Sequence, residues 1–88
     1  MKIKLSGNLL RFSNFRSEVA VSAPSVIGGI HVLVETFPDL KKVLLDAQGG
    51  PRAIHRLFLN GDLLAREDFQ RPVASNDELS ILTAIAGG

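Results

Sequence analysis

Hydrophobic and polar positions alternate with a period of two in three parts of the chain. This period places one set of side chains on one face of a strand, so each segment is expected to be a strand with one buried face. The first two strands are expected to form a hairpin, joined by an irregular stretch with Leu9, Leu10, Phe12 or Phe15 turned inward. The three segments are 1–5, 18–22 and 78–83, with the inward pairs Ile3 and Leu5, Val19 and Val21, and Leu79 and Ile81.

The period changes to that of a helix after Pro24. Ser25 is a plausible N-cap, and the residue before Pro38 is disfavoured in helical conformation, so one helix is expected between these two points. Gly28 and Gly29 each cost about 1 kcal/mol relative to alanine, so the helix must be held by packing on a sheet. A short second helical segment is expected at 39–45. The apolar positions are Val26, Ile30, Leu33, Val34 and Phe37 in the first helix, and Leu40 and Leu44 in the second.

The second half of the chain predicts two more strands. Residues 54–59 form the best strand candidate, and Asn60-Gly61 directly after it is a turn signal because both residues tolerate positive φ. Leu63 and Leu64 indicate a short strand after the turn. A hairpin, a crossing helix and further strands, in this order, predict an α+β fold with one main helix across one face of a sheet.

Composition excludes several classes of function. The 88 residues fit one domain, and the formal net charge of +1 comes from basic residues scattered along the chain, which predicts no nucleic-acid partner. The longest largely apolar run, 30–34, already contains His31 and is far too short to span a membrane. No signal peptide is evident, so a cytoplasmic location is expected. The sequence contains no cysteine, which leaves no thiol nucleophile and no zinc site of the common kind.

The second half also carries sequence features of a known family. The strand and turn Phe58-Leu59-Asn60-Gly61, the segment 77–82 with its acidic turn and last strand, and the final Ala84-Ile85-Ala86-Gly87-Gly88 resemble the ThiS/MoaD-type sulfur carrier proteins. The resemblance implies a ubiquitin-like β-grasp fold, with a mixed four- to five-stranded sheet crossed by one main helix. Residues 1–83 would form this domain, and residues 84–88 a flexible C-terminal tail.

One departure from the family bears on the pathway. This chain has Thr83-Ala84 where the molybdopterin-synthase small subunits usually carry a proline pair. Its length and the long loop after the helices look less like the thiazole carriers. They look more like the actinobacterial cysteine-synthesis carriers or the archaeal small modifiers.

The resemblance implies that the chain is a carrier and not an enzyme in its own right. A partner enzyme of the ubiquitin-activating type would use ATP to adenylate the carboxyl group of Gly88, and a sulfur donor would convert it to a thiocarboxylate for a sulfur-acceptor synthase in molybdopterin, cysteine, thiamin or related biosynthesis. The chain itself would bind no cofactor or metal. Ala84, Ile85, Ala86 and Gly87 would thread into the partner, where two glycines suit a narrow channel because they lack side chains.

Three alternatives to the sulfur carrier stay open. The first is a ubiquitin-like modifier that is conjugated to lysines through the same Gly-Gly end, and the second is the small subunit of a molybdopterin-synthase-like complex. The third is a β-grasp interaction domain whose tail is incidental.

A docking surface is also predicted from strand alternation. Phe58 and Leu82 fall on the face opposite Leu57 and Ile81, which predicts a solvent-facing apolar patch with Arg56 beside it. The alternative is that the segment 65–72 covers one of the two apolar side chains. Arg56 and Arg66 are candidates for steering an acidic partner, whereas His31 and His55 are too far apart in sequence to suggest a metal site.

Overall fold

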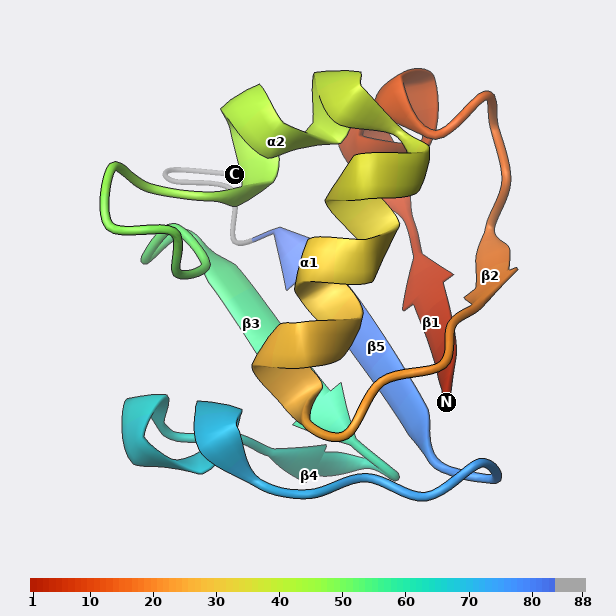
Figure 1. The fold of residues 1–88 in the computed structure, drawn as a ribbon. Coiled ribbons are helices and arrows are strands. Elements are labelled where there is room, and N and C mark those ends of the chain that lie inside the picture. Colours follow the sequence, from red (N-terminus) through yellow and green to blue (C-terminus); the bar gives the residue numbers. More distant parts are fainter. Residues whose placement is uncertain (84–88) are drawn as a thin grey trace.

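The computed structural model describes residues 1–83, which form one mixed sheet with helices against one of its faces (Figure 1). The strand order is β2-β1-β5-β3-β4. β1 and β5 are parallel, and the other neighbouring pairs are antiparallel. The strands are β1 (Lys2–Leu5), β2 (Glu18–Ala20), β3 (His55–Leu59), β4 (Asp62–Leu63) and β5 (Glu78–Thr83).

The main helix crosses the sheet, and three shorter helices lie around it. In Figure 1 helix α1 runs diagonally over the strands, and α2 follows it at the top of the view. None of the helices in the described part of the chain is long and apolar enough to cross a membrane. This arrangement confirms the expected α+β fold. The helices are η1 (Gly7–Phe12), α1 (Val26–Thr36), α2 (Pro38–Leu44) and η2 (Arg66–Gln70), of which η1 and η2 are 3₁₀ helices.

Helix α1 begins and ends where the sequence indicates. The side chain of Ser25 accepts a hydrogen bond from the backbone N–H of Gly28 at 3.1 Å, which satisfies one of the free amides of the first turn. The helix stops before Phe37-Pro38. Gly29 is buried where the helix approaches Met1, and a Cβ at this position would overlap the Met1 Cε atom. Close packing on the N-terminal strand therefore compensates for the low helix propensity of glycine.

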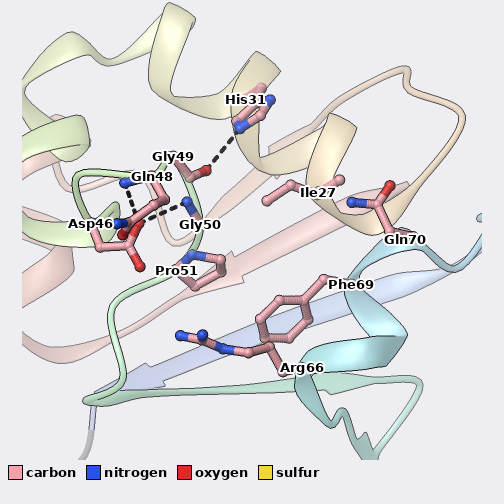
Figure 2. Close-up of a pocket in the computed structure, with 10 residues that line it drawn as sticks. All are labelled: Ile27, His31, Asp46, Gln48, Gly49, Gly50, Pro51, Arg66, Phe69 and Gln70. Atoms are coloured by element: carbon pink, nitrogen blue, oxygen red, sulfur yellow. Dashed lines mark hydrogen bonds between the residues drawn. The ribbon is translucent and has the colours of Figure 1, made fainter.

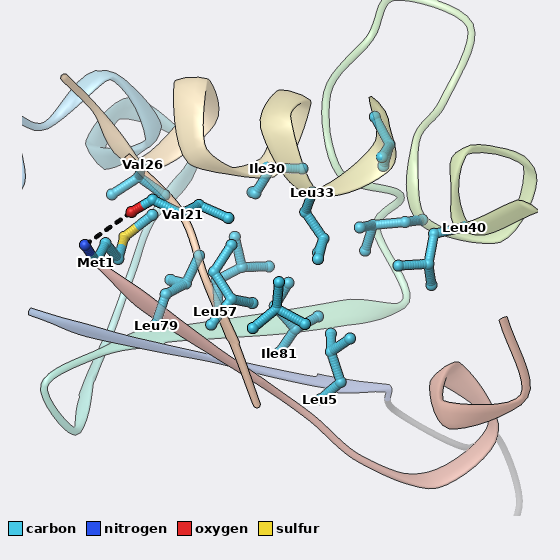
Figure 3. Close-up of a cluster of buried hydrophobic side chains, with 14 of the residues drawn as sticks. Met1, Leu5, Val21, Val26, Ile30, Leu33, Leu40, Leu57, Leu79 and Ile81 are labelled. Atoms are coloured by element: carbon cyan, nitrogen blue, oxygen red, sulfur yellow. Dashed lines mark hydrogen bonds between the residues drawn. The ribbon is translucent and has the colours of Figure 1, made fainter. Parts of the chain in front are cut away.

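The hydrophobic core lies between α1 and the inner face of the sheet (Figure 3). The inward positions predicted for β1, β2 and β5 are all buried, as are Leu40 and Leu44 of α2. The side chains that lose all contact with solvent come from both layers and include Ile3, Ile30, Leu33, Leu79 and Ile81.

The stretch between β1 and β2 turns apolar side chains inward as expected, because Leu9 is buried and Leu10 and Phe12 pack against the core. It begins with the 3₁₀ helix η1, and the fourth candidate, Phe15, is 74% exposed. Asn14 and Phe15 both have positive φ, at 54° and 61°. The buried Ser13 holds this loop because its hydroxyl oxygen lies 3.0 Å from the carbonyl oxygen of Arg16. A local hydrogen-bond network therefore keeps an aromatic residue in a conformation that bulky side chains avoid.

We expect Phe15→Gly to leave the free energy of unfolding unchanged or to raise it by up to about 1 kcal/mol, because glycine relieves the left-handed strain at the cost of some unfolded-state entropy. Little apolar burial is lost, since the ring is mostly exposed. Phe15→Val is the matched control and should be destabilising, because β-branched residues tolerate positive φ least. Urea denaturation of the three proteins checks the order, and a clear loss of stability in Phe15→Gly would contradict it.

The two polar turns at one end of the sheet are hydrogen-bonded to each other. Asn60 and Gly61 have φ of 52° and 88°, as the predicted hairpin turn requires. The side chain of Asn60 donates to Asp77 Oδ1 at 3.0 Å and accepts from the backbone N–H of Glu78 at 2.9 Å. Asp77 also accepts from the backbone N–H of Ala74 at 2.7 Å. Asn60 thus ties the β3–β4 turn to the turn that precedes β5.

These contacts make the stability of the domain depend on pH through Asp77. The hydrogen bond from Ala74 and then that from Asn60 hold the pKa of the Asp77 carboxyl below its ordinary value. A carboxyl group with a lowered folded-state pKa stabilises the protein above its unfolded pKa of about 3.9, and that contribution is lost as the pH falls through the folded-state value. We therefore expect Asp77→Asn to be less stable than wild type at neutral pH. Denaturation curves at several pH values should show the difference disappearing below about pH 3.9.

Candidate functional site

The outer face of the sheet, opposite α1, carries an apolar patch at the β5-β3-β4 side. Phe58 of β3 pairs with Ser80 of β5 and with Leu63 of β4, so the side chains of these residues lie on the same face. Leu82 pairs with Arg56 on that face as well. Leu63 is 59% exposed, Leu82 is 44% exposed and Phe58 is partly exposed. We call Phe58, Leu63 and Leu82 the outer patch.

Arg56 stands at the edge of the outer patch. Its side chain is exposed, and Nη1 donates a hydrogen bond to the carbonyl oxygen of Ala53 at 2.9 Å. This bond holds the guanidinium group near the start of β3 while other donors stay available. The geometry therefore places a positive charge next to exposed apolar surface.

The rest of the outer face is charged and internally compensated. Lys4 Nζ lies 2.9 Å from Glu78 Oε1 and 4.0 Å from Glu18, and Lys2 Nζ lies 3.8 Å from Glu18. The hydrogen bond between Lys4 and Glu78 is the main cause that raises the pKa of Lys4 and lowers that of Glu78. Exposed pairs of this kind add little stability. They neutralise the β2-β1 side of the sheet, so the outer patch is the distinctive surface of this face.

The last strand leads directly from the outer patch to the base of the predicted tail. Leu82 faces outward, and Thr83 is the last residue described; the predicted site residues Ala84, Ile85, Ala86, Gly87 and Gly88 lie outside the described residues.

Thr83 is held at this base by a buried histidine. His55 is 7% exposed, its Nε2 lies 2.8 Å from the carbonyl oxygen of Val43, and its Nδ1 lies 3.1 Å from Thr83 Oγ1. A carbonyl oxygen only accepts, so Nε2 carries the proton, and in the neutral ring Nδ1 accepts from the threonine hydroxyl. His55 therefore links α2 to the end of β5, and sequence reasoning gave it no role beyond the exclusion of a metal site.

Arg66 does not join Arg56. It lies on the helix side of the sheet, where it lines a hollow of about 430 Å³ between α1, η2 and the loop after α2 (Figure 2). His31 Nε2 lies 3.0 Å from the carbonyl oxygen of Gly49 and fastens that loop to α1. The two arginines proposed to steer one partner thus belong to opposite faces of the molecule.

The structure answers two further points about the predicted patch. Phe58, Leu82 and Arg56 do share one face, and their docking role stays a prediction. The alternative that the segment 65–72 covers the patch is wrong, because η2 packs against α1 and Arg71 accepts a backbone hydrogen bond from Val26 on the helix side. Leu63 was missed as a member of the patch, although the two-residue turn Asn60-Gly61 fixes its position opposite Phe58.

The sheet order, the parallel contact of the first and last strands and the crossing helix define the ubiquitin-like β-grasp fold, as the resemblance implied. Several solved structures share it over nearly the whole chain. Small archaeal modifier protein 1 (SAMP1) from Methanosarcina acetivorans superimposes with a TM-score of 0.86 at 24% identity, covering 99% of this chain and 94% of that protein. A chain of the Amycolatopsis orientalis BexX/CysO complex gives 0.85 at 19% identity, with 99% and 98% covered.

A third similar structure is Urm1 from Sulfolobus solfataricus, with a TM-score of 0.73 at 24% identity and with 94% of this chain and 99% of that chain covered. No family model matches the sequence, and no curated protein matches it either. At these identities the likeness establishes the fold.

Proposed function

We propose that this chain is a sulfur carrier whose Gly88 carboxyl group is adenylated by a ubiquitin-activating-type enzyme and then converted to a thiocarboxylate. The observation that carries the proposal is the arrangement around β5. On a β-grasp scaffold, this strand runs past an exposed apolar patch and leads within five residues to Gly87-Gly88. One residue of the patch, Leu82, is thus only six positions before Gly88 in the sequence.

The chemistry follows from the properties of a carboxylate. Its negative charge makes it a poor electrophile, and it is ionised at neutral pH with a pKa of about 3.5. When a carboxylate oxygen attacks the α-phosphorus of ATP, pyrophosphate leaves and an acyl-adenylate forms. A sulfur nucleophile at the oxidation level of sulfide then attacks the carbonyl carbon, and the bond to AMP breaks. Sulfur ends on a backbone carbon, so a chain without cysteine is able to carry it.

The partners are an adenylating enzyme, which supplies ATP binding and catalysis, and a synthase that accepts the sulfur. We place the chain, with both partners, in the cytoplasm. The chain itself acts as a co-substrate and not as an enzyme. A partner protein accompanies CysO in the similar Amycolatopsis complex, which is consistent with a fold that works by presenting itself to other proteins.

The second candidate is a protein modifier that uses the same activated end to form an isopeptide bond with lysines. The similarity to small archaeal modifier protein 1 favours it. After digestion with trypsin, conjugates would be recognised by an unusually long branch peptide that stays attached to the target lysine. Arg71 precedes Pro72 and no lysine follows Arg66, so the branch on a target lysine would comprise residues 67–88. High-mass conjugates with this branch would establish the modifier, and their absence with a thiocarboxylate present would establish the carrier.

The test uses the adenylating enzymes of the same organism whose ATP–pyrophosphate exchange the full chain stimulates. Deletion of Gly87 and Gly88 is expected to reduce this stimulated exchange to background. Addition of one alanine after Gly88 is the matched control, because it keeps both glycines and displaces the carboxyl group; it should also be inactive. Both variants should melt like wild type, since the altered residues lie beyond the core strand. Undiminished exchange with the deleted chain would contradict the proposal.

A further inference from the structure

A second hollow lies at the end of β5, on the side away from the outer patch. It has a volume of about 280 Å³ and opens beside the last described residue. Its lining comes from four parts of the chain. It includes Leu9 and Phe12 of η1, Val43 of α2, Ile54 directly before β3, His55 of β3 and Thr83 of β5.

The sheet topology explains why these parts meet. β1 and β5 are parallel neighbours, so the segment that follows β1 and the end of β5 lie at the same end of the sheet. η1 follows β1 directly and packs against β5. Figure 1 shows η1 and α2 together at this end, where β5 also stops. The hollow therefore adjoins the base of the predicted tail.

The hollow is open and preorganised. Ile54 is 52% exposed, although it is a large apolar residue, and Phe12 is partly exposed. The hydrogen bonds of His55 to Val43 and Thr83 fix two of the walls relative to each other. A surface whose shape is already set loses little conformational entropy when a partner covers it.

Charge distinguishes the rim of the hollow. Arg11 lines it and is exposed, and within residues 1–83 it takes part in no ion pair. A partner carboxylate is the group that a guanidinium at such a rim recognises best.

We propose that this hollow is a second docking surface for the enzyme that receives the tail. An apolar side chain at the mouth of the enzyme's channel packs between Phe12 and Ile54, and a carboxylate beside it binds Arg11. The inference rests on the proposed function.

The length of the tail requires the enzyme to bind close to the hollow. Five extended residues span at most about 17 Å, so an enzyme that reaches the Gly88 carboxyl group must bring the mouth of its channel close to Thr83. Leu82 and Thr83 point to opposite sides of β5, and the enzyme thus contacts the strand end from both sides, through the outer patch and through the hollow.

Ile54→Glu and Arg11→Glu test the proposal with an adenylating enzyme that the wild-type chain stimulates in ATP–pyrophosphate exchange. Both side chains are exposed, so the fold should persist, and thermal melts verify it. We expect kcat/KM for the chain to fall at least about tenfold in each variant, because each loses a contact that is desolvated in the complex, while KM for ATP stays constant. Phe15→Ser and Arg16→Glu are matched controls in the β1–β2 loop and should stay close to wild type.

The outcomes separate this inference from the proposed function. If no adenylating enzyme of the organism acts on the wild-type chain, the proposed function fails. If the wild-type chain is activated and Ile54→Glu and Arg11→Glu are activated equally well, only the docking role of the hollow is overturned.

The alternative occupant of the hollow is the chain's own Ile85 side chain, and methyl NMR of the free protein tests this alternative. A shift of the Leu9 and Ile54 methyl resonances on Ile85→Ala would place that side chain in the hollow and overturn the proposal. Unchanged resonances, with the same methyls broadened on addition of the enzyme, are the result expected.

Discussion

Phe58→Asp is expected to lower kcat/KM for activation of the chain by about 100-fold or more, because it places a carboxylate where the partner must exclude water from an apolar contact. The side chain points away from the core, between Leu63 and Ser80 on the outer face. The melting temperature should therefore change little. ATP–pyrophosphate exchange at several concentrations of the chain measures the effect.

Ala20→Asp is the control for this prediction. Ala20 lies exposed on β2 and pairs with Lys2 on the same outer face, at the opposite side of the sheet. The same charge introduced there should leave activation unchanged. Normal activation of Phe58→Asp would exclude the outer patch as a docking surface, whereas equal impairment of both variants would point to general charge repulsion.

Leu79→Ala is expected to lower the free energy of unfolding by about 3 kcal/mol, because it removes a fully buried side chain from the centre of the sheet. In a domain of this size the melting temperature should fall by more than about 10 °C. Leu82→Ala is the same substitution three positions along β5, at a side chain that is 44% exposed. It should cost less than about 1 kcal/mol.

The two leucines should also differ in function. Leu82→Ala removes part of the outer patch and should impair activation while the protein stays folded. Leu79→Ala should retain activation at temperatures at which it is folded. Similar losses of stability in the two variants would show that β5 does not present alternate faces to the core and to solvent.

The positions of the strands and of α1 and α2 could be predicted because their residues follow one period and end at clear signals, whereas η1 and η2 were not predicted. The alternation around Ile3 and Leu79 requires a sheet with one buried face, and Ser25 and Pro38 mark the two ends of α1. Local propensity would have argued against α1 because of its glycines. The helix forms because Gly29 packs against Met1. In the sequence, only the period of the hydrophobic positions indicated this helix.

Other features depend on contacts between distant parts of the chain. The exposure of Phe15 follows from the hydrogen bonds of a buried serine, which no local pattern indicates. The bond between Asn60 and Asp77 joins two turns that each looked self-sufficient in sequence. Arg56 and Arg66 could be assigned to opposite sides of the molecule only once the path of η2 was known.

The candidate site was predictable in part. Alternation alone placed Phe58 and Leu82 on the outer face, and the register of the Asn60-Gly61 hairpin contained the signal for Leu63. The hollow at the end of β5 could not be predicted, because Phe12, Val43 and Ile54 meet only through the parallel pairing of the first and last strands.

The most direct test of the account is the intact mass of the chain after incubation with ATP, the adenylating enzyme and a sulfide source. We predict that the mass of the full chain, ending at Gly88, increases by the difference between one sulfur atom and one oxygen atom, and that the chain without Gly87 and Gly88 shows no increase. An unchanged mass with an enzyme that binds the chain, or a mature chain that ends before these glycines, would contradict the claim that Gly88 carries the sulfur.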